Sequence, residues 1–365
     1  MNTSPLRRLA LPATAILAVG LTLSACGDNN SSGSGGSGGG TLNGGGATSQ
    51  ANAQTTWRAD YQKANGGTIN YEEVGSGTGV ENFTSKAYSF AGSDSYLDSD
   101  QMTAASDACA SDVVEVPGYV SPIAVAFNLP GIDSLNLDAK TIADIFQGKI
   151  TTWNDDAIAS QNADAKLPDT AIATIHRSDE SGTTKNFTDY LNKAGEGAWP
   201  AEADSVWPTS AKGGQGFDGT SGVIGGLTDT EGAIAYADDS AVKADGSLGV
   251  VSIKVGDSYN PPTAEGAAQV LQESPPAPDQ PATSMATDID RTATAKGDYP
   301  LMLVSYLLAC ETYSDSATAD MVKGYLTYIV SSDGQQAAAD AAGSAPLSSS
   351  TSQKATSIVA KISAS

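Results

Sequence analysis

Residues 171–195 read AIATIHRSDESGTTKNFTDYLNKAG, and this stretch determines the fold class. Its first five residues, 171–175, form a short apolar run that is typical of a buried strand. Apolar side chains then recur at i, i+3, i+4 and i+7 from Phe187, which predicts a helix over 181–194 that ends at Gly195. A strand followed directly by an amphipathic helix is the repeating unit of α/β proteins.

The same alternation continues on both sides of this stretch. Further helices are predicted at residues 55–64, 76–88, 141–147 and 317–330. Further strands are predicted at 113–116, 123–127, 248–253 and 301–308. Residues 257–287 are rich in Pro, Ala and acids, and we interpret them as a surface excursion with one helix at 264–271. The sequence therefore predicts the α/β class.

Length and charge limit the possible functions. With 365 residues the chain can form one to three domains. It carries 42 acidic and 19 basic residues, and without Arg7 and Arg8 the 42 acids face 17 basic residues, a net charge of −25. Such a chain does not bind nucleic acid or an anionic membrane through its overall field. If it binds an anion, local geometry has to overcome the global potential.

The N-terminus is typical of an export signal. Arg7 and Arg8 precede an apolar run over 9–23, which is too short for a membrane-spanning helix. The run ends in Leu-Ser-Ala-Cys-Gly at 23–27, which resembles the lipobox of bacterial lipoproteins. The resemblance implies a signal peptide over 1–25 and diacylation (palmitate) of Cys26, and two acyl chains anchor a protein stably. The alternative is an ordinary secretory signal with an accidental cysteine.

The Gly-, Ser- and Asn-rich stretch that follows cannot bury apolar surface. We interpret residues 26–43 as a flexible tether rather than a phosphate-binding loop. The other two cysteines, Cys109 and Cys310, favour a disulfide because the chain carries an export signal. The alternative is two unpaired buried cysteines.

The segment from Arg177 to Thr183 combines the groups that hold a tetrahedral oxyanion. Arg177 supplies a guanidinium fork, and Ser181 and Thr183 lie at a helix start, where backbone N–H groups are unpaired. The alternative is an ordinary capped helix with a surface arginine. Two more segments place a hydroxyl and glycine-flanked amides before a predicted helix: Gly75–Val80 and Gly44–Thr48. Three such helix starts favour an anion-binding site over an ordinary capped helix.

Two stretches, residues 141–155 and 176–184, carry a specific resemblance, and 213–219, 232–236 and 345–347 support it. From about residue 41 onward the chain resembles the phosphate-binding protein of the bacterial high-affinity phosphate ABC importer. This resemblance implies a two-lobe, periplasmic-binding-protein-like fold (Venus flytrap, type II) with the ligand between the lobes. Lobe I is expected to comprise 44–119 plus 299–365, and lobe II 120–298.

Carried over residue by residue, the resemblance implies a set of phosphate ligands and one acid, Asp179, that holds the arginine. The implied ligands are Thr48, Ser49, Ser76, Asp94, Arg177, Ser181, Gly182 and Thr183. The family usually has Phe-Pro where Ser49-Gln50 stand, and Glu180 replaces a common glycine. An ionised Asp94 can only accept a hydrogen bond, so it favours a protonated oxyanion over sulfate. Without the resemblance, Asp94 reads as one surface acid in an acidic stretch.

The resemblance also implies the partners and the location. We expect a monomer on the outer face of the plasma membrane that delivers inorganic phosphate to the importer's permease subunits, with no cofactor, no metal and no nucleic acid. An enzyme is disfavoured because His176 is the only histidine and Ser181 lacks a nucleophile-elbow sequence. A binding protein for another oxyanion and a non-transport cell-surface protein are the alternatives. Trp57, Trp153 and Phe187 are predicted core residues, and His176 a structural neighbour of Arg177.

Overall fold

The computed structural model describes residues 40–365, and each segment predicted as helix or strand overlaps an element of that type. The strands are β1 Thr41–Gly46, β2 Thr68–Glu72, β3 Phe90–Ser93, β4 Val113–Phe127, β5 Ser134–Leu137, β6 Ala173–Arg177, β7 Gln215–Phe217, β8 Ala233–Asp238, β9 Gly249–Val255, β10 Ser258–Asn260, β11 Met302–Cys310, β12 Thr312–Tyr313 and β13 Ser363–Ala364. The helices are η1 Thr48–Gln50, α1 Ala51–Asn65, α2 Ser76–Thr84, α3 Ser99–Cys109, α4 Ala139–Phe146, α5 Asp156–Ala159, α6 Gly182–Ala194, α7 Gly219–Asp229, α8 Asp239–Asp245, α9 Ala264–Glu273, α10 Ser316–Val330, α11 Ser332–Ala342 and α12 Ser349–Val359.

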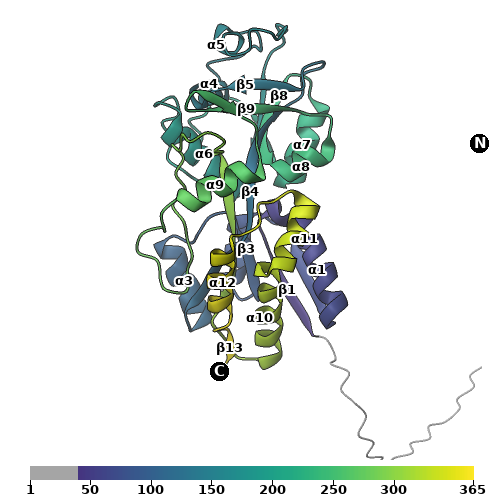
Figure 1. Ribbon diagram of the computed structural model, residues 1–365, viewed down its shortest axis with the longest axis vertical. Coiled ribbons are helices and arrows are strands. Elements are labelled where there is room, and N and C mark those ends of the chain that lie inside the picture. The colour runs from purple at the N-terminus through teal and green to yellow at the C-terminus, as the bar shows by residue number, and fades with distance from the viewer. Residues whose placement is uncertain (1–39) are drawn as a thin grey trace, which may run out of the picture. The chain divides into compact units, whose positions relative to one another are not determined.

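One long strand, β4, connects two groups of strands. The order across the sheet is β2-β1-β3-β11-β4-β8-β6-β7, and β9 joins β4 to β5 and β10. Residues 113–122 of β4 pair antiparallel with β11, and its last five residues pair antiparallel with β8. Figure 1 shows helices on both sides of each strand group, with α1, α3 and α10–α12 around the one and α4–α8 around the other.

The two strands predicted at 113–116 and 123–127 are therefore halves of one strand. Pro117 and Gly118 between them suggest a break, because Pro lacks an N–H and Gly favours turns. The structure accommodates them at a register shift, where β11 changes partner between Ser305 and Tyr306. Such a bulge lets the strand continue with a local change of direction. All 15 residues of β4 are buried.

The predicted tether extends too far at its C-terminal end. Residues 41–43, inside the predicted range 26–43, begin strand β1, which pairs in parallel with β2 and β3. The glycines after them serve close packing rather than flexibility. A Cβ at Gly44 would lie 2.3 Å from the ring of Phe90, and one at Gly46 would lie 2.1 Å from the carbonyl oxygen of Gly92. The signal peptide and residues 26–39 of the predicted tether lie outside the described residues.

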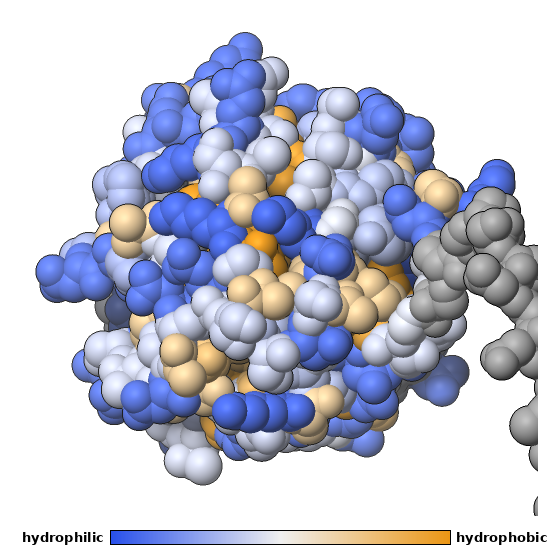
Figure 2. Space-filling model, turned by 90° about the horizontal axis from the view of Figure 1, so that it is seen from below, coloured by the Kyte–Doolittle hydropathy of each residue, from blue (hydrophilic) through white to orange (hydrophobic). Residues whose placement is uncertain are grey.

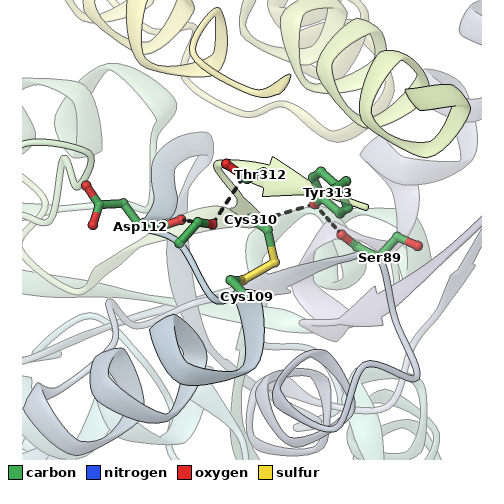
Figure 3. Close-up of a disulfide and its surroundings, with 7 residues drawn as sticks. Ser89, Cys109, Asp112, Cys310, Thr312 and Tyr313 are labelled. Atoms are coloured by element: carbon green, nitrogen blue, oxygen red, sulfur yellow. Dashed lines mark hydrogen bonds between the residues drawn. A yellow bond between two sulfur atoms is a disulfide. The ribbon is translucent and has the colours of Figure 1, made fainter. Parts of the chain in front are cut away.

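A disulfide joins Cys109 at the end of α3 to Cys310 at the end of β11, as predicted (Figure 3). Hydrogen bonds surround it: Tyr313 Oη donates to the carbonyl oxygen of Ser89 at 2.7 Å, and the amide of Thr312 donates to Ser111 Oγ at 3.1 Å. The bridge fixes the end of the central strand β11 to the helix that follows β3. Ser305 on β11 and Asp94, which follows β3, reach the site described below.

The predicted core residues Trp57, Trp153 and Phe187 are fully buried. Among residues 40–365 the large hydrophobic side chains are buried or half-buried except for that of Val206. In Figure 2, seen from below, hydrophilic residues cover most of one end of the molecule and hydrophobic residues form small patches between them. Within the described range none of the helices combines the length and apolar character that crossing a bilayer requires.

Candidate oxyanion-binding site

Three helix starts meet at one buried place. They are η1 with the following α1, then α2, and then α6. A Cβ built on Gly182, the first residue of α6, would lie 2.6 Å from both Ser76 Oγ at the start of α2 and Asp94 Cβ. Thr183 Oγ1 donates to Asp94 Oδ2 at 3.1 Å. Residues that are far apart in the sequence thus form one cluster.

The local sequence explains why these helices begin where they do. Gly75 adopts a φ of +85°, which is open to glycine and lets the chain turn sharply before Ser76. Ser181 is the N-cap of α6, and its Oγ accepts from the amide of Thr184 at 3.2 Å. The amides of Gly182 and Thr183 precede the first intrahelical bond, so they have no partner within the helix. They can donate to an anion at the positive end of the helix dipole.

Asp94 follows β3 directly and is 2% exposed, so the interpretation as a surface acid is wrong. Its Oδ1 accepts from Ser49 Oγ and Ser305 Oγ, both at 2.6 Å. Burial raises the pKa of Asp94, and the hydrogen bonds from Ser305, Ser49 and Thr183 and the charge of Arg177 oppose that rise. The three hydroxyls therefore favour an ionised, hydrogen-bond-accepting carboxylate in a buried place.

Arg177 ends β6 and is held by Asp179, as predicted. Its Nε donates to Asp179 Oδ1 at 2.6 Å, and its Nη2 donates to Asp179 Oδ2. The amide of Gly219 also donates to Asp179, at 3.1 Å. Burial alone would raise the pKa of Asp179, but the hydrogen bonds and charge of Arg177 outweigh it, and the pKa is lowered. The pair leaves the Nη1 edge of the guanidinium for another acceptor.

The structure brings together every residue that the sequence predicted for the site. The predicted side chains are 6% exposed or less: Thr48, Ser49, Ser76, Asp94, Arg177, Ser181 and Thr183. The half-buried Asp179 lies behind Arg177. A cavity of about 660 Å³ lies next to the cluster, lined in part by Thr48 and Ser49. Contact of these groups with a ligand stays a prediction.

Comparisons with known proteins identify the family of this chain. The family model for the PBP superfamily domain matches residues 31–333. Phosphate-binding protein PstS 3 of Mycobacterium tuberculosis is 34% identical over 330 residues, covering 86% of the chain and 88% of the relative. The chain belongs to the PstS family of phosphate-binding proteins.

Two solved structures share the fold of this PstS-family chain. One is a high-affinity periplasmic phosphate-binding protein (PfluDING) bound with phosphate, with a TM-score of 0.69 and 22% identity. The match covers 86% of the chain and 92% of that protein. The other is a phosphate-binding protein from Stenotrophomonas maltophilia, with a TM-score of 0.67, 20% identity and coverage of 87% and 93%. The predicted periplasmic-binding-protein-like α/β fold is confirmed.

Some residues of this PstS-family site were not predicted. Ser305 on β11 donates to Asp94, and Thr220 Oγ1 lies 2.8 Å from Thr48 Oγ1. Tyr236 Oη accepts from the amide of Arg177 at 3.3 Å. Ser305 carries a visible signal, because it is a hydroxyl within a strand of apolar residues. Thr220 has no such signal, since only the tertiary structure places it opposite Thr48.

The departures from the family pattern have structural consequences. Ser49, where the family usually has Phe, donates to Asp94 through its side chain. Glu180, where glycine is common, has an exposed side chain that lies over Gly77, and a Cβ on Gly77 would come within 2.3 Å of it. The carbonyl oxygen of Glu180 accepts from the amide of Gly77 at 3.1 Å. Glu180 is therefore accommodated because its neighbour is a glycine.

His176 is a structural neighbour of Arg177, as predicted. Its ring stacks on Trp207 with centroids 4.7 Å apart, and Nδ1 lies 2.8 Å from the carbonyl oxygen of Arg177. Burial lowers the pKa of His176. Within residues 40–365 no group of three or more His, Cys, Asp or Glu side chains is placed to hold a metal ion.

Proposed function

We propose that this protein binds inorganic phosphate and delivers it to the permease of an ABC-type importer. The observation that carries the proposal is the meeting of Arg177, the free amides that begin α6, and the buried carboxylate of Asp94. A positive fork and unpaired amides suit a tetrahedral oxyanion. The names of the PstS-family relatives, which are phosphate-binding proteins, support the same ligand.

In this proposal each side chain makes a particular hydrogen bond to the ligand or to a neighbouring side chain. Arg177 uses Nε and Nη2 on Asp179, so Nη1 and the second hydrogen of Nη2 form the fork for two phosphate oxygens. The hydroxyls of Thr48, Ser76 and Ser181, with the amides of α6, including that of Thr183, donate to the remaining oxygen lone pairs. The Thr183 hydroxyl gives its one hydrogen to Asp94 Oδ2. In this proposal Asp179 fixes the plane of the guanidinium and does not touch the ligand.

Asp94 determines which oxyanion is accepted. An ionised carboxylate next to an anion is favourable only if the ligand carries a proton to donate, as phosphate does near neutral pH. Sulfate has no proton at that pH, so its oxygen would face the Asp94 oxygen with no hydrogen between them. Leaving two buried acceptors unpaired costs several kcal/mol, a factor of about 10³ or more in affinity.

The ligand is proposed to lie between two lobes, formed by 44–119 with 299–365 and by 120–298, and the strands β4 and β11 run where the lobes join. Contacts between the groups of elements support closure around the site: Thr183 with Asp94, Thr48 with Thr220, and Gly77 with Glu180. All of these contacts would be lost if the lobes separated. Closure over phosphate would present one defined surface to the permease.

The proposal places the protein outside the cytoplasm, attached to the outer face of the plasma membrane through lipid on Cys26. The PstS-family membership supports an extracytoplasmic transport role, and the lipobox-like sequence around Cys26 supports the anchor. The protein would act as a monomer that carries phosphate without reacting with it, so it is not an enzyme.

Isothermal titration of the full-length, phosphate-stripped chain with phosphate and then sulfate tests the proposal. We expect one-to-one phosphate binding with a Kd of about 1 μM or tighter, about −8 kcal/mol, and no sulfate binding. In Asp94→Asn the preference for phosphate should be lost. Asp298→Asn, which changes a buried acid outside the site, is the matched control. Equal binding of sulfate by the wild type would refute the role of Asp94, and no binding of either anion would refute the function.

A further inference from the structure

Asp94 is the end of a buried chain of hydrogen bonds that starts on helix α10. Tyr325 Oη donates to Gln54 Oε1 at 2.7 Å, and Gln54 Nε2 donates to Gln50 Oε1 at 2.9 Å. Gln50 Nε2 then donates to Ser305 Oγ at 2.6 Å, and Ser305 Oγ donates to Asp94 Oδ1 at 2.6 Å. The side chains of these residues are buried.

The charge of Asp94 fixes the direction of every bond in this chain. An ionised carboxylate only accepts, so Ser305 has to donate its one proton to it. Ser305 Oγ then accepts, and Gln50 must turn its NH₂ toward it and its carbonyl toward Gln54. The same requirement passes through Gln54 to the hydroxyl of Tyr325. With this direction of donation every member of the hydrogen-bond chain has a partner, and the chain ends in a donor to Asp94.

The chain also determines which oxygen of Asp94 is available to a ligand. Oδ1 accepts from both Ser305 and Ser49. Oδ2 accepts, among the described residues, only from Thr183, at 3.1 Å. Two short bonds thus occupy Oδ1, and Oδ2 has a free lone pair on the side of α6.

We propose that Gln50, Gln54, Ser305 and Tyr325 are positioning residues that keep Asp94 ionised and turned so that Oδ2 accepts the proton of the bound oxyanion. The inference rests on the proposed phosphate function and adds the residues on which its selectivity depends. None of the four needs to touch the ligand.

Burial makes such a device necessary. Burial raises the pKa of Asp94, and the Ser305 hydrogen bond is the first contribution that opposes this. Other groups face Asp94 as well: Arg177 at the end of β6 favours the ionised form, whereas Asp238 at the end of β8 and Tyr71 on β2 interact unfavourably with it when ionised. Loss of a hydroxyl donor would raise the pKa of Asp94 further and favour the protonated carboxyl, which could donate to sulfate.

The surrounding sequence is adapted to the chain. Gly92 leaves room for Gln50, since a Cβ there would lie 2.8 Å from Gln50 Nε2. The register shift of β11 occurs between Ser305 and Tyr306, next to the residue that reaches Asp94. All members belong to elements of the proposed lobe I: η1, α1, β11 and α10. The chain should therefore persist when the cleft opens, before the ligand arrives.

The test compares the phosphate affinity of the full-length protein across pH. In Ser305→Ala the ratio of its phosphate Kd to that of the wild type should rise as pH falls, because Asp94 becomes protonated at a higher pH. Taking the ratio removes the protonation of phosphate itself. One hydrogen bond to a charged group corresponds to about ten- to hundredfold in Kd, so we expect the ratio at pH 5 to exceed that at pH 8 by about tenfold.

Three further variants separate positioning from folding. Tyr325→Phe removes the far end of the chain and should show the same trend with a smaller size. Tyr328→Phe on the same helix is the matched control, because its hydroxyl donates to Asp60 and not to the chain, and its ratio should stay flat. Ser305→Thr keeps the hydroxyl and should restore the wild-type profile.

A readout without phosphate completes the test. In ¹³C-aspartate-labelled, phosphate-free protein, the Asp94 carboxyl resonance, assigned by its loss in Asp94→Asn, should titrate at higher pH in Ser305→Ala and Tyr325→Phe. A flat Kd ratio together with an unchanged Asp94 titration would overturn the inference and leave phosphate binding intact. If the wild type bound no phosphate, the proposed function would fail, and the NMR titration alone would decide whether the chain sets the charge of Asp94.

Discussion

A methyl group added at Gly182 tests whether the start of α6 has to approach Asp94 as closely as the structure shows. In Gly182→Ala the new Cβ would lie 2.6 Å from Asp94 Cβ and from Ser76 Oγ. Gly182 does not have a positive φ, so alanine suits the local backbone and the effect comes from the contact alone. The atoms in the way include the Asp94 backbone, whose Cα lies 3.1 Å from the new Cβ and cannot rotate away.

The geometry gives the size of the effect. Ordinary contact starts at 3.4 Å, so α6 has to withdraw by about 0.8 Å. The Thr183–Asp94 hydrogen bond of 3.1 Å would then lengthen to about 3.9 Å and be lost. Any ligand bond that spans the same gap is lost with it. Losing one or two such bonds to charged groups costs about 2–4 kcal/mol, which is about 30- to 700-fold in Kd.

Isothermal titration with phosphate measures this loss, and thermal unfolding without phosphate checks the fold. Unfolding of the ligand-free Gly182→Ala protein should change by less than about 1 kcal/mol, since separated lobes remove the clash. Gly225→Ala is the control: it lies in α7, where a Cβ meets nothing within 4 Å, and its phosphate affinity should equal that of the wild type. If Gly182→Ala bound phosphate within threefold of the wild type, the close approach would not be part of the bound state.

Three further predictions concern Asp179, the disulfide and Glu115. Asp179→Asn leaves Arg177 without its anion, so the ligand-free protein should lose about 3 kcal/mol of unfolding free energy. Phosphate should then raise the Tm of this variant more than it raises the Tm of the wild type. An equal rise in Tm would count against the pairing of Arg177 with Asp179. Cys310→Ser opens a link that spans 201 residues and should cost about 2–5 kcal/mol in thermal unfolding with phosphate affinity within threefold of the wild type, and a large loss of affinity would contradict this. Burial raises the pKa of Glu115 from 4.5 to about 7. The folded state therefore binds its proton more tightly, and the free energy of unfolding should fall between pH 4.5 and 7 by at most about 3 kcal/mol relative to Glu115→Gln; parallel pH profiles would refute the assignment.

The local signals in the sequence predicted the elements well, because amphipathic spacing and capping act over a few residues. The helix after Arg177 starts after Ser181 and ends at Ala194, as its apolar spacing and Gly195 indicated. The predictions failed where residues far away in the sequence determine the local structure. Gly44–Gly46 has the composition of a linker, yet Phe90, Tyr88 and Gly92 approach it so closely that only glycine fits in strand β1. Nothing within the first 50 residues shows this.

The site was predictable to a similar extent. Arg177, Ser181 and Thr183 are close in sequence, so a helix start with a preceding arginine identifies them. Asp94 required the family resemblance, because an acid in an acidic stretch carries no signal of its burial. Ser305 and the glutamines behind it were missed: a hydroxyl in an apolar strand marks Ser305 as unusual, but only the folded chain shows its partners on other strands and helices.

The charges of the site show how so acidic a protein can bind an anion. Arg177 is neutralised by Asp179, so the side chains of the site carry no net positive charge, and an ionised Asp94 adds a negative one. The neighbouring cavity is lined by Glu73, Asp218 and other acids. Attraction must then come from dipoles: three helix starts, each with the equivalent of about half a positive charge, and hydroxyls fixed by packing. Dipoles act over a few ångströms and salt screens them little in a buried place. The acidic surroundings therefore slow the arrival of phosphate, whereas the helix starts and Asp94 determine its affinity and its selection.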